Sequence, residues 1–288
     1  MVEPALAIEA APRSHAAPPP RRLVRSLAVL LGWVVGGVLR VRRRHVEQSV
    51  RQAGIADAAG VAKRMYRELA RGLLDLLALG LRRSGSPSDL VKLDESLVAW
   101  LSGHQGGAVV ATAHTAGWDV LACAAAERVE LTVVSKRLSV RWLDALWQRL
   151  RHDRGVALAH PGAAAHAARA ALARGGVVAM MIDQAPERRR GTVVQPFLGR
   201  AARIDLAPAL LAARARVPLV VVFGRRGRDG VVTGELRGVL CPPARGGRAW
   251  AEAAMREATR ALDRFVRERP EQWLWMHRRW KDARGARP

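Results

Sequence analysis

The sequence predicts an α/β fold with a mixed, mostly parallel sheet sandwiched by helices. Short uncharged runs rich in valine, at 108–113, 131–135, 177–182 and 217–223, are typical of strands buried on both faces. Longer stretches with helical spacing separate them, and this alternation is typical of a sheet covered by helices on both sides. A further strand at 231–240 is expected to pair antiparallel with the one before it, which makes the sheet mixed.

Composition narrows the class of protein. A chain of 288 residues, half of them hydrophobic, can bury the core of one large α/β domain or of two small ones. The formal net charge is +23. One interpretation of this charge is a general compositional bias toward arginine. The other is a function that requires attraction to anionic membranes, phosphate groups or an acidic protein, and the two are compatible. Cys123 and Cys241 are isolated, which argues against a disulfide framework or a structural zinc site and fits a reducing compartment.

The first 44 residues differ from the remainder. Residues 1–20 are rich in Ala and Pro and are predicted to be a disordered leader. An uncharged apolar run at 27–39 follows, with arginines on both sides, and it is short for a spanning helix, which needs about 20 residues. Segment 21–44 is therefore predicted to be a membrane-associated helix with basic flanks that lies on or shallowly in the bilayer. The alternative is a buried helix of the globular domain, which is expected to occupy 45–288.

The remaining elements follow from local patterns. An apolar face made by leucines at 69, 73, 76 and 77 predicts one helix over 48–81. Ser, Gly and Pro at 84–88 predict a loop. The other predicted elements are a short strand with a helical turn at 93–101, a strand at 155–158, and helices at 140–151, 161–174, 204–216 and 249–267.

A histidine and an aspartate follow the strand at 108–113. His114 stands at its carboxyl end, where open α/β sheets place their ligand sites. Asp119 comes five residues later, and the two can meet only if the chain turns near Gly117, because residues five apart on a helix do not face each other. Asp119 would then accept the Nδ1 proton of His114 and leave Nε2 as a general base. The alternative is an unremarkable polar strand end followed by a helix cap.

Motifs in a fixed order carry a resemblance to a known family. His114-x4-Asp119 is followed by Ser135-Lys136, Asp183-Gln184, Gln-Pro-Phe-Leu-Gly at 195–199 and Pro-Glu-Gln-Trp-Leu-Trp-Met-His-Arg-Arg-Trp-Lys at 270–281. Over residues 23–281 the chain resembles the late acyltransferases of lipid A biosynthesis, the lauroyl/myristoyl transferases of the lysophospholipid acyltransferase superfamily. Many lipid A enzymes have Glu where this chain has Asp119, whereas Asp is commoner in the wider superfamily and in mycobacterial mannosyl-lipid acyltransferases.

The resemblance implies a fold, a reaction and a location. The fold would be glycerolipid acyltransferase-like, with an N-terminal membrane helix. The reaction would move a fatty acyl chain from acyl carrier protein to a hydroxyl of a glycolipid such as a lipid A precursor, without a cofactor, at the cytoplasmic face of the bacterial inner membrane. His114 and Asp119 would be catalytic. The alternative pair is acyl-CoA with a lysophospholipid or another glycolipid, and the acyl chain length and the acylated position stay open.

Five further residues are candidates for substrate binding. Arg151 matches a family arginine and would clamp a phosphate or steady an oxyanion, unless it is a solvated helix-end cation. Asp183, after a buried strand, would hold Arg151 or a substrate hydroxyl, unless it caps a turn, and Gln184 shares this argument. Lys136 and Arg189, with neighbouring arginines at 137, 188 and 190, would line a groove for an anionic ligand or form a solvated face.

Other patterns favour or exclude particular classes of protein. Trp273, Trp275 and Trp280, among cationic residues and His277, predict an aromatic and cationic membrane edge, with core packing of one or two tryptophans as the alternative. His104, His160 and His166 have no partners at metal-ligand spacing, and no Gly-rich phosphate loop or GxSxG motif is present. A nucleic-acid binder would need a recognisable module, which the chain lacks. A non-catalytic membrane protein with the same fold remains an alternative.

Overall fold

The computed structural model describes residues 21–81, 86–136, 140–160 and 162–281. The leader predicted for 1–20 lies outside the described residues. So do Arg137 and the first part of the loop predicted at 84–88. Every structural statement below concerns the described residues.

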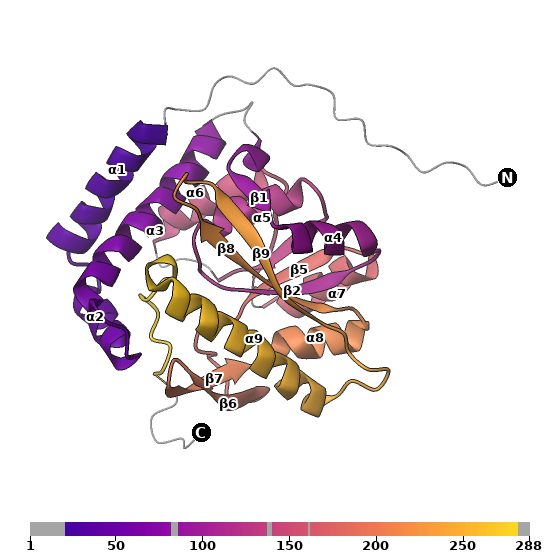
Figure 1. The fold of residues 1–288 in the computed structure, drawn as a ribbon. Helices are drawn as coiled ribbons and strands as arrows, with labels where there is room; N and C mark the ends of the chain where they lie inside the picture. The colour runs from indigo at the N-terminus through magenta and orange to yellow at the C-terminus, as the bar shows by residue number, and fades with distance from the viewer. Residues whose placement is uncertain (1–20, 82–85, 137–139, 161, 282–288) are drawn as a thin grey trace.

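A seven-stranded sheet forms the centre of the fold, in the order β1-β9-β8-β2-β5-β3-β4 (Figure 1). Neighbours pair in parallel except β8 with β9, so the predicted mixed, mostly parallel sheet is confirmed, as is the antiparallel pair. The strands are β1 (Val91–Leu93), β2 (Ala108–Thr112), β3 (Leu131–Val134), β4 (Ala157–Ala159), β5 (Val177–Met181), β8 (Leu219–Arg226) and β9 (Val232–Leu240).

Helices cover both faces of this sheet, as predicted. Alternate residues of β2 show why: Val109 and Ala111 belong to one hydrophobic cluster and Ala108 to the other. One cluster includes side chains of α2 (Arg43–Gln52), α7 (Ala164–Ala173), α8 (Ala207–Ala215), α9 (Arg248–Glu268) and the start of α3 (Ala58–Leu81). The other includes α4 (Glu95–Gly103), α5 (Trp118–Ala126), α6 (Arg141–His152) and the end of α3. Short 3-10 helices occupy Pro87–Asp89 and Pro270–Gln272.

Two element predictions were wrong. The helix expected over 48–81 is split into α2 and α3, because Gly54 and Asp57 take positive φ angles of 71° and 51°. The helix expected over 204–216 begins only at Ala207, and an antiparallel hairpin of β6 (Thr192–Phe197) and β7 (Arg200–Asp205) precedes it. Leu198 and Gly199 both have positive φ, which is the backbone conformation of a tight hairpin turn. The glycine that ends the Gln-Pro-Phe-Leu-Gly motif is the sequence signal for this turn.

The predicted membrane segment forms α1 (Arg21–Trp33) and the π-helical turn η1 (Val34–Val38), which lie along α3 (Figure 1). One face packs closely, because a Cβ atom at Gly36 would lie 2.3 Å from the Tyr66 ring. The opposite face exposes large apolar side chains, namely Leu23, Leu27, Val29, Leu30, Trp33, Val38 and Leu39. No single described helix has the length and apolar composition to cross a membrane, while Leu23–Val38 and Arg43–Gln52, bent by 90°, pass that test only as a pair.

Candidate active site

His114 and Asp183 meet at the carboxyl edge of the sheet because of strand register. Strands β2 and β5 are parallel neighbours, and Thr112 is paired with Met181. The next bond of the ladder, from the Ile182 N–H to the Thr112 carbonyl at 2.8 Å, carries this register past the strand ends. His114 and Asp183 each stand two residues beyond the pair, so the register brings them side by side.

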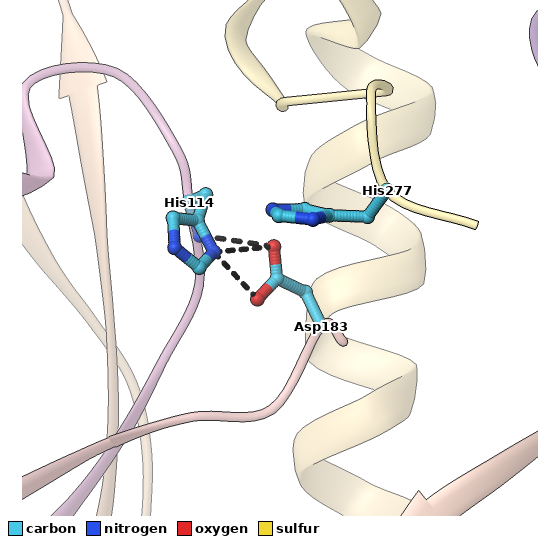
Figure 2. Close-up of side chains that lie close together, drawn as sticks. All are labelled: His114, Asp183 and His277. Atoms are coloured by element: carbon cyan, nitrogen blue, oxygen red, sulfur yellow. Dashed lines mark hydrogen bonds and ion pairs between the residues drawn. The ribbon is translucent and has the colours of Figure 1, made fainter. Parts of the chain in front are cut away.

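Asp183 is the partner of the His114 ring (Figure 2). Nδ1 of His114 lies 3.0 Å from Oδ1 of Asp183, and the backbone N–H of His114 donates to Oδ2 at 3.0 Å. The indole N–H of Trp273 donates to the same Oδ2 at 3.0 Å. Burial would raise the pKa of the fully buried Asp183, but the charge and hydrogen bonds of His114 and the charge of His277 outweigh it and hold this pKa well below its usual range. The carboxylate therefore stays ionised and fixes Nδ1 as the protonated nitrogen.

The predicted bond between His114 and Asp119 is not formed, and that prediction was wrong. Asp119 is the second residue of α5, which follows the left-handed N-cap Gly117. Its carboxylate accepts from Nε of Arg151 at 2.8 Å and from the indole N–H of Trp147 at 3.3 Å, both on α6. The turn at Gly117 does bring the chain around, but it aims Asp119 at α6 while the register aims His114 at β5.

The other predicted site residues are placed unequally. Arg151 is paired with Asp119 and not with Asp183, so the first of the two alternatives for Asp183 was wrong. Arg151 and Gln184 line the same cavity as His114. Lys136 lines it as well, and its ammonium is paired with Glu187 at 2.9 Å. Arg189 is exposed and is not among the lining residues.

The C-terminal segment lies against the site instead of forming a membrane edge. Trp273, Trp275 and Trp280 are all buried, so that interpretation was wrong and the packing alternative holds for all three. The backbone N–H of Leu274 donates to the His114 carbonyl at 3.0 Å, and this bond places the segment beside the strand end. Trp273 then reaches Asp183, and His277 reaches the cavity.

A cavity of about 690 Å³ opens beside His114. Leu131 and Val177, the first residues of β3 and β5, line it, whereas His114 and Gln184 follow the last residues of β2 and β5. The cavity therefore extends along the length of the strands toward their carboxyl edge, where the polar lining gathers. Its other walls are mainly apolar, from α4, α5 and β8, and include Leu97, Trp100, Leu101, Leu121, Val129 and Val222. Such a cavity suits a long apolar ligand whose reactive end lies at the sheet edge.

Comparison with known families identifies the protein class. The sequence model of the family described as bacterial lipid A biosynthesis acyltransferase matches residues 20–282. The chain belongs to this family. It is therefore an acyltransferase of lipid A-type glycolipid synthesis, and the predicted resemblance and enzyme class are confirmed. No curated protein matches the chain.

Sequence reasoning missed one polar side chain of this acyltransferase site. The ring of His277 lies 4.8 Å from that of His114, centroid to centroid, and Figure 2 shows it beside the Asp183 carboxylate. Burial, and next the charge of His114, lower the pKa of His277 to about 4. The available signal was a histidine among three tryptophans, a segment too apolar to be wholly exposed.

The same three side chains form a donor set for a metal. The ligand atoms of His114, Asp183 and His277 lie within 4.8 Å of one another, and two imidazoles with a carboxylate suit zinc. In this structure the carboxylate oxygens are engaged by Nδ1 and the backbone N–H of His114 and by Trp273. A metal would have to displace those hydrogen bonds, so the arrangement present is that of a histidine oriented by a carboxylate.

Proposed function

We propose that this protein is a membrane-associated O-acyltransferase that moves a fatty acyl chain from acyl carrier protein to a hydroxyl of a lipid A precursor, at the cytoplasmic face of the bacterial inner membrane. Family membership supplies the reaction class and the type of acceptor. One observation carries the mechanism. The His114 ring is held by Asp183 through Nδ1, and His114 lines a mainly apolar cavity that extends along the strands.

His114 is the general base in this scheme. Its Nε2 takes the proton of the acceptor hydroxyl, and the oxygen attacks the thioester carbonyl carbon to form a tetrahedral oxyanion. When the oxyanion collapses, the carbon–sulfur bond breaks and the imidazolium returns the proton to the leaving sulfur. Asp183 stabilises the imidazolium electrostatically without taking its proton, since its own pKa is far lower. The products are an ester and the free thiol of the carrier.

Asp119 acts through Arg151. The pair is nearly buried, with 5% and 12% of the side chains exposed, and it fixes the guanidinium at the cavity wall. From there Arg151 binds a phosphate or the oxyanion, with Ser135 at 3.5 Å from its Nη1 as a weak second contact. Gln184 and Lys136 contact the polar part of the substrate. Arg189 belongs to the surface that receives the acidic carrier.

The N-terminal unit, which consists of α1 and η1, is proposed to bind the membrane. Its exposed apolar face is flanked by arginines, the composition of an interfacial segment near anionic lipid. The unit lies on the bilayer through α1 and η1 while the opposite face of α1 stays packed on α3. Vesicles containing anionic phospholipid should pellet with the full chain, and Leu30→Asp with Trp33→Asp should abolish this.

Mass spectrometry of the acceptor tests the reaction. Purified full-length protein, acyl carrier protein thioester and a lipid A precursor should give a product heavier by the mass of one fatty acid less one water. His114→Ala, checked to be folded at the assay temperature, is the negative control. A wild-type protein that transfers no acyl chain to lipid A precursors contradicts the proposal, and transfer only to a lysophospholipid from acyl-CoA supports the alternative pair.

Salt dependence tests the donor. A net charge of +23 should accelerate association with an acidic carrier, and charges are screened within about 8–10 Å at physiological ionic strength. Raising salt should therefore increase the Michaelis constant for acyl carrier protein much more than that for acyl-CoA. Charge reversal at Arg189 should reproduce part of this effect. Equal salt sensitivity of both donors would remove the argument for carrier docking.

A further inference from the structure

Two side chains near the junction between η1 and α2 hold the backbone next to His277 by hydrogen bonds. Nη1 of Arg42 donates to the Met276 carbonyl at 2.8 Å, and Nε2 of His45 donates to the His277 carbonyl at 3.1 Å. Two side chains more than two hundred positions away thus hold consecutive peptide carbonyls. Arg42 itself is the N-cap of α2 with φ at 54°, a conformation that costs free energy for residues other than glycine. Surrounding contacts must therefore maintain this junction.

His277 lies where a second polar group could meet the acceptor. It lines the cavity that holds His114, and the two rings are tilted neighbours. Among the described residues, its ring has one hydrogen-bonding contact, from Nε2 to the side-chain nitrogen of Gln184 at 3.5 Å, which is at the outer limit for such a bond. His114 already occupies the carboxylate of Asp183. The His277 ring is thus held by its backbone and its packing, with hydrogen-bonding capacity left over.

Electrostatics suit a binding role for His277 and not a second base. Burial, then the proximity of His114, lower the pKa of this ring to about 4, so it is neutral at pH 7. A neutral ring retains one N–H donor and does not repel the imidazolium that forms at His114 during transfer. The donor can hydrogen-bond an oxygen that is losing its proton.

We propose that a ring N–H of His277 binds the acceptor hydroxyl beside His114, and that Arg42 and His45 position His277 through its backbone. The hydroxyl proton goes to Nε2 of His114, while His277 donates a hydrogen bond to the same oxygen and orients its attack. This proposal rests on the proposed acyltransferase function. It makes the N-terminal unit part of the architecture of the reaction centre as well as a membrane-binding element.

Kinetics of His277 variants in detergent micelles test the contact. His277→Phe keeps a ring but no hydrogen-bond donor, and it should lower kcat for transfer to a lipid A precursor about a hundredfold. His277→Gln restores a donor and should recover about tenfold of this loss, while the Michaelis constant for the carrier stays unchanged. A wild-type protein without transferase activity would refute the proposed function itself. An active wild type with His277→Phe within about twofold of it would overturn only the His277 assignment.

The positioning role is tested by two matched arginines. Arg42→Ala removes the bond to Met276, whereas Arg44→Ala removes the same charge from an exposed neighbour, and both should alter vesicle binding equally. Arg42→Ala should lower kcat about tenfold, Arg42→Lys should restore most of it, and Arg44→Ala should stay within about twofold of wild type.

A double-mutant cycle separates positioning from general destabilisation. In a His277→Phe background, Arg42→Ala should have no further effect on kcat, because the group it positions is gone. His45→Ala should behave in the same way. Losses that multiply in the double variant, or equal losses from Arg42→Ala and Arg44→Ala, would overturn the positioning role.

Discussion

Two buried carboxylates stand near the reaction centre, and their partners differ. Asp119 faces the guanidinium of Arg151, whereas Asp183 faces the imidazole of His114. A guanidinium keeps its proton at any physiological pH, so the first pair is a fixed ionic anchor. An imidazole carries one nitrogen that donates a proton and one that accepts a proton, so the second pair can take part in proton transfer. The chemistry of each aspartate is therefore set by its partner and not by its own residue type.

The largest effect expected from breaking this contrast is at His114. His114→Ala removes the base and should reduce kcat about a thousandfold or more, within the range of positioned acid–base catalysis. The melting temperature should fall, because the fully buried Asp183 loses the ring it is paired with, so activity is compared at a temperature where the variant is folded. Quantitative transfer assays check this, and near-normal activity would show that another group takes the proton.

The next largest effect on activity is expected at Asp183. Asp183→Asn keeps the shape but no longer fixes the tautomer of His114 or stabilises its imidazolium, so kcat should fall roughly a hundredfold or more. Asp119→Asn should lower kcat clearly less. The two kcat values under saturating substrate decide which aspartate orients the base. If Asp119→Asn lost more activity than Asp183→Asn, that role would belong to Asp119.

Asp119→Asn should instead act mainly on stability. It leaves the nearly buried Arg151 without an ionic partner, which costs about 3–5 kcal/mol in comparable sites. Combining Asp119→Leu with Arg151→Met should recover most of the free energy of unfolding while leaving transfer impaired. Urea unfolding measures both. If the double variant were as unstable as Asp119→Asn, the pair would not be the reason for the loss.

Acid should destabilise the protein through His277. Its pKa is about 4 when folded and near 6.5 when unfolded, so between these values the unfolded chain binds the additional proton. Stability from this group is complete above pH 6.5 and falls, by up to about 3 kcal/mol, as the pH drops to 4. Asp183, whose pKa is lowered, loses its contribution only below the pKa of an ordinary aspartate. Unfolding at pH 7, 5.5 and 4.5 should be less pH-dependent in His277→Gln, and an unchanged slope would contradict this.

The smallest effect is expected at Ser135. Its hydroxyl lies 3.5 Å from Nη1 of Arg151, whereas Asp119 lies 2.8 Å from Nε. Ser135→Ala should therefore change kcat by less than about threefold, since a long, weak bond contributes little. A much larger loss in the transfer assay would mean that Ser135 contacts the substrate directly.

Local sequence patterns were sufficient for most of the fold. The apolar runs at 108–113 and 177–182 gave both central strands, because a strand covered on both faces needs nothing but apolar residues. Local patterns predicted the interruptions of helices less well. Gly54 and Asp57 interrupt a helix through backbone angles, and the hairpin before Ala207 depends on a two-residue turn. Such features involve few residues and are easily hidden by helical composition on either side.

The candidate site was predictable residue by residue but not contact by contact. His114, Asp119, Arg151 and Asp183 were all singled out, yet the predicted pairing of His114 with Asp119 was wrong, and so was the alternative that paired Asp183 with Arg151. A usable signal was present, since two six-residue apolar runs each end in a polar residue, and equal runs on adjacent parallel strands bring those ends together. Using it requires knowing that β2 and β5 are neighbours, although 69 positions separate His114 from Asp183.

The sequence by itself determined the class of fold and the family and pointed to His114 as the candidate base, because these depend on local periodicity and on ordered motifs. Only the tertiary structure decided which carboxylate orients His114, since strand order and register are set by packing across the whole sheet. It also decided the place of His277, which reaches the site because the Leu274 backbone bonds to the carbonyl of His114. Contacts between distant segments depend on the three-dimensional path of the chain, and no local pattern encodes that path.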